Sequence, residues 1–177
     1  MSKICFQCGG ELQVNKNKPY HYTESGLDNV VLFGINQYKC KACSETFVSI
    51  PMMEELHLLL GRELCCKKGL LTGKEVKFIR KELHIKAKEM AQALGVTAST
   101  VSRWENDKEP IGETHDRLLR SFYMLYASEQ TEKVLHRDAV HIFSNLPTKR
   151  KRLRRATKLE FSPADWMGDR YPEFCPA

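Results

Sequence analysis

The chain has 177 residues and a formal net charge of +6, which allows one ordinary domain or two small ones. Seven positive charges lie between Lys149 and Lys158 without a single acid, so the rest of the chain sums to −1 and the basicity is local. No run of 18 apolar residues occurs and the N-terminus lacks the apolar core of a signal peptide, which argues against a membrane or secreted protein. We therefore expect a cytoplasmic protein, in which seven cysteines favour metal binding over disulfides.

Two closely spaced cysteine pairs mark residues 1–50 as a metal-binding module. Each pair has two residues between its cysteines, and this spacing lets two tight knuckles direct four thiolates at one ion. A complete four-sulfur set is closed to substrates, so we predict one structural Zn²⁺ per chain, held by Cys5, Cys8, Cys40 and Cys43. The alternatives are an iron–sulfur cluster, free thiols, or a ligand set in which His21 replaces a cysteine.

The small size of this module explains its need for a metal. A segment this short buries too little apolar surface to fold alone, and zinc ligation supplies on the order of 10 kcal/mol of folding free energy. Gly9 and Gly10 follow the first pair, where a left-handed turn points backbone N–H groups at the sulfurs, whereas the second knuckle has Ser44. The apolar run 30–38 predicts one strand that leads into the second knuckle.

A linker helix is predicted within residues 51–72. After Pro51, apolar residues recur on one helical face as far as Leu64. We interpret this face as packing against one of the neighbouring domains, with a self-association surface as the alternative. Cys65 and Cys66 follow at its end, and we interpret them as inert thiols, the alternative being a redox sensor.

The clearest pattern is a helix-turn-helix within residues 73–147. Helices are predicted over 74–83 and 87–94, and Gly95 supplies the turn before a third helix, whose N-cap is Thr97 and whose Val101 and Trp104 face the core. Helices over 113–128 and 132–146 complete a five-helix domain. The fourth helix carries the apolar or aromatic residues Leu118, Leu119, Phe122, Leu125 and Tyr126.

The third helix carries the residues that we expect to face DNA. Its exposed N-terminal half enters the major groove in this motif, so we predict base contacts for Ser99, Thr100 and Arg103. The alternative for Arg103 is a surface ion pair with Glu105 or Asp107. Contacts to the DNA backbone are predicted for residues that flank this helix and for the basic run, namely Thr97, Asn106, Lys108, Lys149, Arg150, Lys151 and Arg152.

Residues 148–177 are predicted to form a basic, flexible tail. Pro147 ends the last predicted helix, and the run TKRKRLRR is followed by a segment interrupted by prolines. Three interpretations stand: phosphate binding beside the operator, solubility, or a partner-binding segment that folds on contact through Trp166, Tyr171 and Phe174.

Residues 80–110, with their LGV turn and VSRWE end, resemble the Xre/lambda-repressor type of helix-turn-helix. Joined to the CxxCGG, CxxC and VLFGINQYKC motifs, residues 3–128 resemble the MqsA-type antitoxins, also described as YgiT-type zinc finger plus helix-turn-helix proteins. The resemblance implies dimers that bind palindromic operator DNA and repress their own operon, with a zinc module that grips a ribonuclease toxin. Arg103 matches that pattern. Ser99 stands where the pattern has an amide side chain, and Ala87 stands where Xre domains often have a phosphate-binding glutamine.

The sequence thus predicts a mainly α protein with a small zinc-bound β module and a five-helix, lambda-repressor-like helix-turn-helix domain. The predicted function is a dimeric, sequence-specific repressor that binds double-stranded operator DNA and regulates its own operon. The alternative is an antitoxin whose main role is to neutralise a ribonuclease toxin through the zinc module or the tail. We expect no enzymatic activity, since no Ser–His–Asp set, phosphate loop or paired-carboxylate signature occurs.

Overall fold

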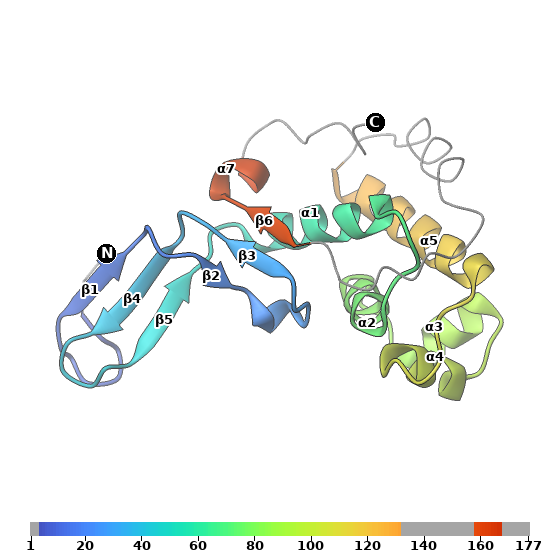
Figure 1. Cartoon of the computed structure of the whole chain (residues 1–177), viewed down its shortest axis with the longest axis horizontal. Helices are drawn as coiled ribbons and strands as arrows, with labels where there is room; N and C mark the ends of the chain where they lie inside the picture. Colours follow the sequence, from blue (N-terminus) through green and yellow to red (C-terminus); the bar gives the residue numbers. More distant parts are fainter. Residues whose placement is uncertain (1–3, 132–157, 168–177) are drawn as a thin grey trace.

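The computed structural model describes residues 4–131 and 158–167. Two small sheets lie at one end of an elongated molecule and a group of helices at the other, with helix α1 between them (Figure 1). The elements in chain order are β1 (Leu12–Asn15), β2 (Tyr20–His21), the short helix η1 (Thr23–Ser25), β3 (Val30–Leu32), β4 (Asn36–Cys40), β5 (Thr46–Ser49), α1 (Met53–Cys66), α2 (Gly73–Glu82), α3 (Ala87–Leu94), α4 (Ala98–Glu105), α5 (Glu113–Thr131), β6 (Leu159–Phe161) and α7 (Pro163–Trp166).

The first sheet is antiparallel, with strand order β1-β4-β5. Leu12 pairs with Cys40, and Tyr38 pairs with both Val14 and Phe47, so these apolar side chains share one face of the sheet. Cys5, Leu12 and Cys40 form a small core of their own, covered in part by Tyr38 and Phe47. Three buried residues are too few to hold a sheet, which agrees with the expectation that a metal stabilises it.

The apolar run 30–38 forms two strands in different sheets, and the prediction of a single strand was wrong. Gly34 adopts a left-handed φ of 70° between β3 and β4, and Ile35 turns into the core. A residue with a side chain rarely takes that backbone conformation, so the glycine is what ends β3 and allows the chain to cross to the other sheet.

The second sheet has strand order β2-β3-β6, and its third strand comes from the C-terminal segment. β6 pairs in parallel with β3, Leu159 opposite Val30. Trp166 of α7 is buried and donates its indole N–H to the carbonyl of Pro51 at 2.9 Å. Residues 158–167 are therefore folded, which corrects the prediction of a flexible tail over this stretch, because an open edge of β3 and an apolar site for the indole are available to them.

The second sheet and the helices share one core. Buried Tyr22, Leu27 and Leu32 belong to the same apolar cluster as the helical residues Leu60 and Phe78. Residues 1–50 thus contribute to two cores: the first sheet has a small core of its own, and the second sheet packs with the helices, as does Val48 of β5.

Helix α1 packs within the chain rather than presenting an apolar face. Leu56, Leu59, Leu60 and Leu64 are buried, and the helix contacts α2, α5 and α7. Its Gly61 lies so close to Tyr123 of α5 that a Cβ there would come within 2.1 Å of the ring. Of the two predicted uses of this helix, the structure supports packing.

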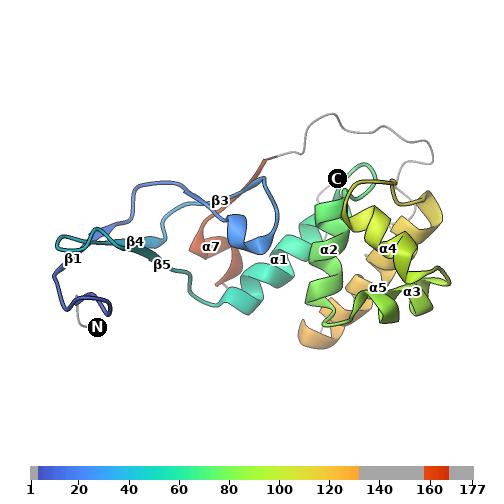
Figure 2. The same ribbon diagram turned by 90° about the horizontal axis from the view of Figure 1, so that it is seen from below.

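Helices α2 to α5 gather at the end of the molecule opposite the first sheet (Figure 2). α2 begins with a capping box formed by Thr72 and Glu75. In α5, Leu119, Tyr123 and Met124 are buried, whereas Leu125 is 61% exposed. The predicted helix 132–146 lies outside the described residues. Within the described part of the chain, no helix has the length and apolar character needed to cross a membrane.

Candidate metal centre and DNA-binding surface

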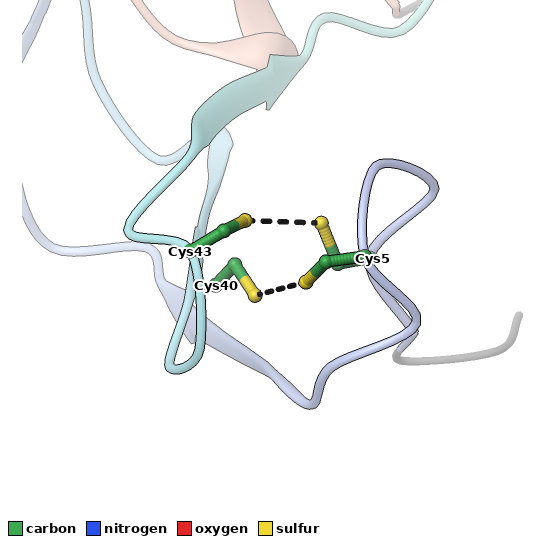
Figure 3. Close-up of side chains that lie close together, drawn as sticks. Cys5, Cys40 and Cys43 are labelled. Atoms are coloured by element: carbon green, nitrogen blue, oxygen red, sulfur yellow. Dashed lines mark hydrogen bonds between the residues drawn. The ribbon is translucent and has the colours of Figure 1, made fainter.

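The four cysteines of the predicted pairs lie close together beside the first sheet, and Figure 3 shows Cys5 facing Cys40 and Cys43. All four sulfurs lie within 4.8 Å of one another, with 3.8 Å between those of Cys5 and Cys43 and 3.4 Å between those of Cys8 and Cys40. A tetrahedral ion with Zn–S distances of about 2.3 Å needs sulfurs roughly 3.8 Å apart. In the described residues this is the group of potential ligands close enough to hold a metal, and His21 is not part of it.

The backbone of the knuckles is arranged around the sulfurs. The N–H groups of Gly10 and Ala42 each lie 3.4 Å from a cysteine sulfur, and Gly10 faces the opposite knuckle so closely that a Cβ would come within 2.9 Å of the Ala42 side chain. Gly9 has the expected left-handed φ of 74°, and Ser44 takes the same conformation in the second knuckle, at 60°. Both knuckles therefore have the same turn, although only the first has glycine for it.

The electrostatics of Cys40 favour the thiolate that a metal binds. The backbone N–H of Cys43 donates to its sulfur and lowers the pKa of the Cys40 thiol from 9.0 to about 6, more than offsetting burial. The pKa of the neighbouring Cys43 thiol is raised, because the backbone N–H of Glu45 lowers it less than the nearby sulfurs and burial raise it, so Cys40 is the thiol of this pair that ionises first. Four thiolates in a closed set suit a structural Zn²⁺, which would supply the folding free energy that the three-residue core of this sheet lacks.

The turn between α3 and α4 forms as the sequence predicts. Gly95 ends α3 with a left-handed φ of 67°, and the Thr97 hydroxyl accepts a hydrogen bond from the backbone N–H of Thr100 at 3.2 Å. Val101 and Trp104 of α4 are buried against the other helices. These contacts fix which side of α4 faces outward.

The outward side of α4 and the loop after it carry the predicted DNA-contacting residues. Ser99 and Arg103 are exposed, and Thr100 is half-buried, with its hydroxyl 2.9 Å from that of Thr97. The side-chain amide of Asn106 donates to the carbonyl of Ser102 at 2.7 Å, which ends the helix. Thr97, Asn106 and Lys108 are exposed beside them.

Arg103 has an acidic partner other than the two that the sequence suggested. Its Nε lies 3.4 Å from a carboxylate oxygen of Glu109. Glu105 instead pairs with Arg80 of α2, and Asp107 accepts a hydrogen bond from the backbone N–H of Gly73 at 2.9 Å. Both acids thus hold α2 against the end of α4. The two helices are so close there that a Cβ at Gly73 would come within 2.4 Å of the Trp104 carbonyl oxygen.

Arg120 is a structural residue that sequence reasoning missed. It is fully buried, and its guanidinium donates to the carbonyls of Cys65 at 2.8 Å and Lys67 at 2.9 Å as well as to Asp116. It thereby satisfies the last carbonyls of α1 and fixes that helix to α5. The spacing of Asp116 and Arg120, four residues apart, is a weak signal because it is common on exposed helix surfaces.

A second missed group links the sheets to the helix-turn-helix. His57 of α1 lies between the Tyr22 hydroxyl, 2.8 Å from Nε2, and the Glu82 carboxylate, 2.9 Å from Nδ1. The three residues come from the second sheet region, α1 and α2, so the contact joins three elements at one point. No local sequence pattern brings them together.

The thiol of Cys65 does not suit the redox-sensor alternative. Its side chain is fully buried, and burial raises its pKa from 9.0 to about 12. A neutral, inaccessible thiol reacts slowly with oxidants.

Several of the predicted tail residues lie outside the described residues. They are the cations of the basic run, Lys149, Arg150, Lys151 and Arg152, and the aromatic residues Tyr171 and Phe174.

A comparison with protein families matches residues 76–115 to the helix-turn-helix family. The matched stretch contains α3 and α4, most of α2 and the start of α5. The comparison with curated proteins found no match, and neither did the comparison with solved structures. Residues 76–115 are therefore a helix-turn-helix, a module typical of DNA-binding regulators.

Proposed function

We propose that this protein is a zinc-containing, sequence-specific repressor that binds operator DNA as a homodimer and regulates its own operon. The observation that carries the proposal is the helix-turn-helix match, which falls on the segment whose α4 is capped, packed on one side and exposed on the other. That exposed side has the size and position of a recognition helix.

In this proposal, Ser99, Thr100 and Arg103 contact bases in the major groove. Arg103 is the long side chain that reaches a guanine, and the hydroxyls contact base edges or thymine methyl groups nearby. Thr97, Asn106 and Lys108 bind phosphates at the two ends of the helix. A single short helix reads too few base pairs for an operator, which favours a dimer on a two-fold site.

The basic run adds phosphate contacts beside the operator. Lys158, the last cation of residues 149–158, directly precedes β6, whose Leu159 donates its backbone N–H to the carbonyl of Asn29 at 2.8 Å. Asn29 follows Asp28, which pairs with Lys74 at the start of α2. Leu159, just after the basic run in sequence, is thus connected through Asn29 and Asp28 to the start of α2. Replacement of Lys149, Arg150, Lys151 and Arg152 by glutamine tests this role better than truncation, which would also remove β6 and α7.

The experiment that tests the repressor is a footprint on the DNA upstream of its own gene. The zinc-loaded full-length protein is expected to protect two half-sites one helical turn apart. Arg103→Ala should lose about 1–3 kcal/mol of binding free energy and relax the sequence preference at one position in each half-site. If this variant protects the same region, with the same affinity and the same sequence preference as the unaltered protein, Arg103 does not read a base.

A second candidate function is an antitoxin that neutralises a ribonuclease toxin through the zinc-bearing sheet. The observation that favours it is an apolar surface there: Phe6 is 77% exposed, and its ring contacts Phe47, which stacks on Tyr38. Exposed aromatic clusters of this kind commonly bind proteins.

The test of the antitoxin is co-expression with the product of a small reading frame adjacent to the gene. Phe6→Asp should abolish co-purification and leave the DNA footprint unchanged, whereas Gln7→Asp, in the same exposed knuckle, should preserve both. Equal co-purification of the two variants would exclude this surface.

A further inference from the structure

The loop after α4 folds back over Arg103. The backbone N–H groups of Lys108 and Glu109 both donate to the Arg103 carbonyl, at 2.9 Å and 3.3 Å. Asp107 makes this possible through a left-handed φ of 54°, and its carboxylate is fixed by the N–H of Gly73. The position of Glu109 relative to Arg103 is therefore set by the backbone.

The Glu109 carboxylate contacts the inner edge of the Arg103 guanidinium. The contact is at Nε, 3.4 Å away, and the two side chains are 53% and 49% exposed. In the described part of the chain, no other acid contacts this guanidinium, since Glu105 pairs with Arg80 and Asp107 caps α2. The outer Nη edge keeps its donors for an acceptor outside the chain.

An acid beside Arg103 weakens the electrostatic attraction between the protein and DNA. An exposed ion pair adds little to stability, and a carboxylate beside phosphates weakens binding to every DNA sequence through like-charge repulsion. Its effect is instead differential. The anionic phosphate is repelled by the Glu109 carboxylate beside Arg103, whereas a guanine carries no charge and offers two acceptors to the free edge of a guanidinium whose other edge contacts Glu109.

We propose that Glu109 is a specificity-determining residue, which positions Arg103 for guanine and lowers the affinity of the protein for non-operator DNA. The inference rests on the proposed repressor function. Glu109 itself need not touch a base, because it acts through the Arg103 side chain.

The experiment compares Glu109→Gln with Glu129→Gln, which removes the same charge from an exposed position on α5. Affinities of the full-length zinc-loaded protein are measured for the footprinted operator, for that operator with the Arg103-dependent guanine replaced, and for random duplex DNA, each at several salt concentrations. Glu109→Gln should raise the affinity for random DNA by roughly three- to tenfold at low salt and lower the ratio of operator to random affinity by about tenfold. Glu129→Gln should leave that ratio unchanged.

A double-mutant cycle separates positioning from charge alone. In the Arg103→Ala background, Glu109→Gln should raise all affinities by the same factor and leave the ratio unaltered, because the side chain that it positions is gone. If Glu109→Gln changes operator and random affinities equally in the unaltered background, the inference is overturned while the repressor stands. If the unaltered protein selects no DNA sequence, the repressor itself is overturned, and the inference with it.

Discussion

The ion pair between Arg80 and Glu105 is what we expect to hold the recognition helix in place, and its removal should be costly. The two side chains are only 15% and 8% exposed, Nη2 lies 3.1 Å from the carboxylate, and Nη1 also donates to the Ile85 carbonyl at 3.0 Å. Glu105→Gln keeps the shape of the side chain but leaves the guanidinium without a counter-charge. Breaking a buried pair at one partner costs about 3–5 kcal/mol, and the partial exposure here places the expected loss at about 3 kcal/mol.

That loss is large compared with a total stability of about 5–15 kcal/mol for a typical domain. Urea unfolding followed by tryptophan fluorescence measures it, because both tryptophans, Trp104 and Trp166, are buried. Arg103→Ala is the matched control: it breaks an ion pair that is half exposed, so it should change the free energy of unfolding by no more than ~1 kcal/mol. If Glu105→Gln unfolds at the same urea concentration as this control, the pair does not hold α4 as we argue.

Three further predictions concern the metal, the C-terminal segment and the buried thiol. Cys40→Ser should reduce bound zinc from about one ion per chain to near zero, measured by metal analysis, and lower the thermal transition of the first sheet; unchanged metal content would contradict the ligand set. Trp166→Ala should cost about 3–5 kcal/mol in the same urea assay, since it leaves a cavity and removes the donor to Pro51, whereas a flexible segment would show no loss. Cys65 should resist iodoacetamide at pH 8 until the protein unfolds, and rapid labelling of the native protein would contradict the burial. Burial raises the pKa of its thiol from 9.0 to about 12, so the thiol releases its proton at lower pH in the unfolded chain than in the folded one. The free energy of unfolding should therefore be unaffected by this thiol below pH 9.0 and fall as the pH rises from 9.0 towards 12.

The helix-turn-helix was predictable because its signals are local. The left-handed turn at Gly95, the cap at Thr97 and the inward spacing of Val101 and Trp104 depend on neighbours within one or two helical turns. The cysteine cluster was predictable for a different reason, since the chemistry of four thiolates at this spacing permits few arrangements.

The missed features depend on contacts between distant segments. An arginine at a position such as Arg120 is usually exposed. Here the side chain is buried because its guanidinium donates to carbonyls at the end of α1, more than 50 residues away in the sequence. Strand β6 is only three residues long, and it is a strand because it pairs with β3, which lies far away in the sequence. Leu125 of α5 is apolar yet exposed, whereas the neighbouring Tyr123 and Met124 face the core. Periodicity alone does not decide between adjacent helical positions.

Binding sites selected from random duplex DNA by the full-length, zinc-loaded protein, with Arg103→Ala selected in parallel, would decide whether α4 reads an operator. We expect the unaltered protein to enrich a two-fold motif with half-sites separated by about 10 base pairs, and the variant to enrich the same motif without one G·C pair in each half. If the unaltered protein enriches no motif, or both enrich an identical one, the proposed base reading by α4 is wrong.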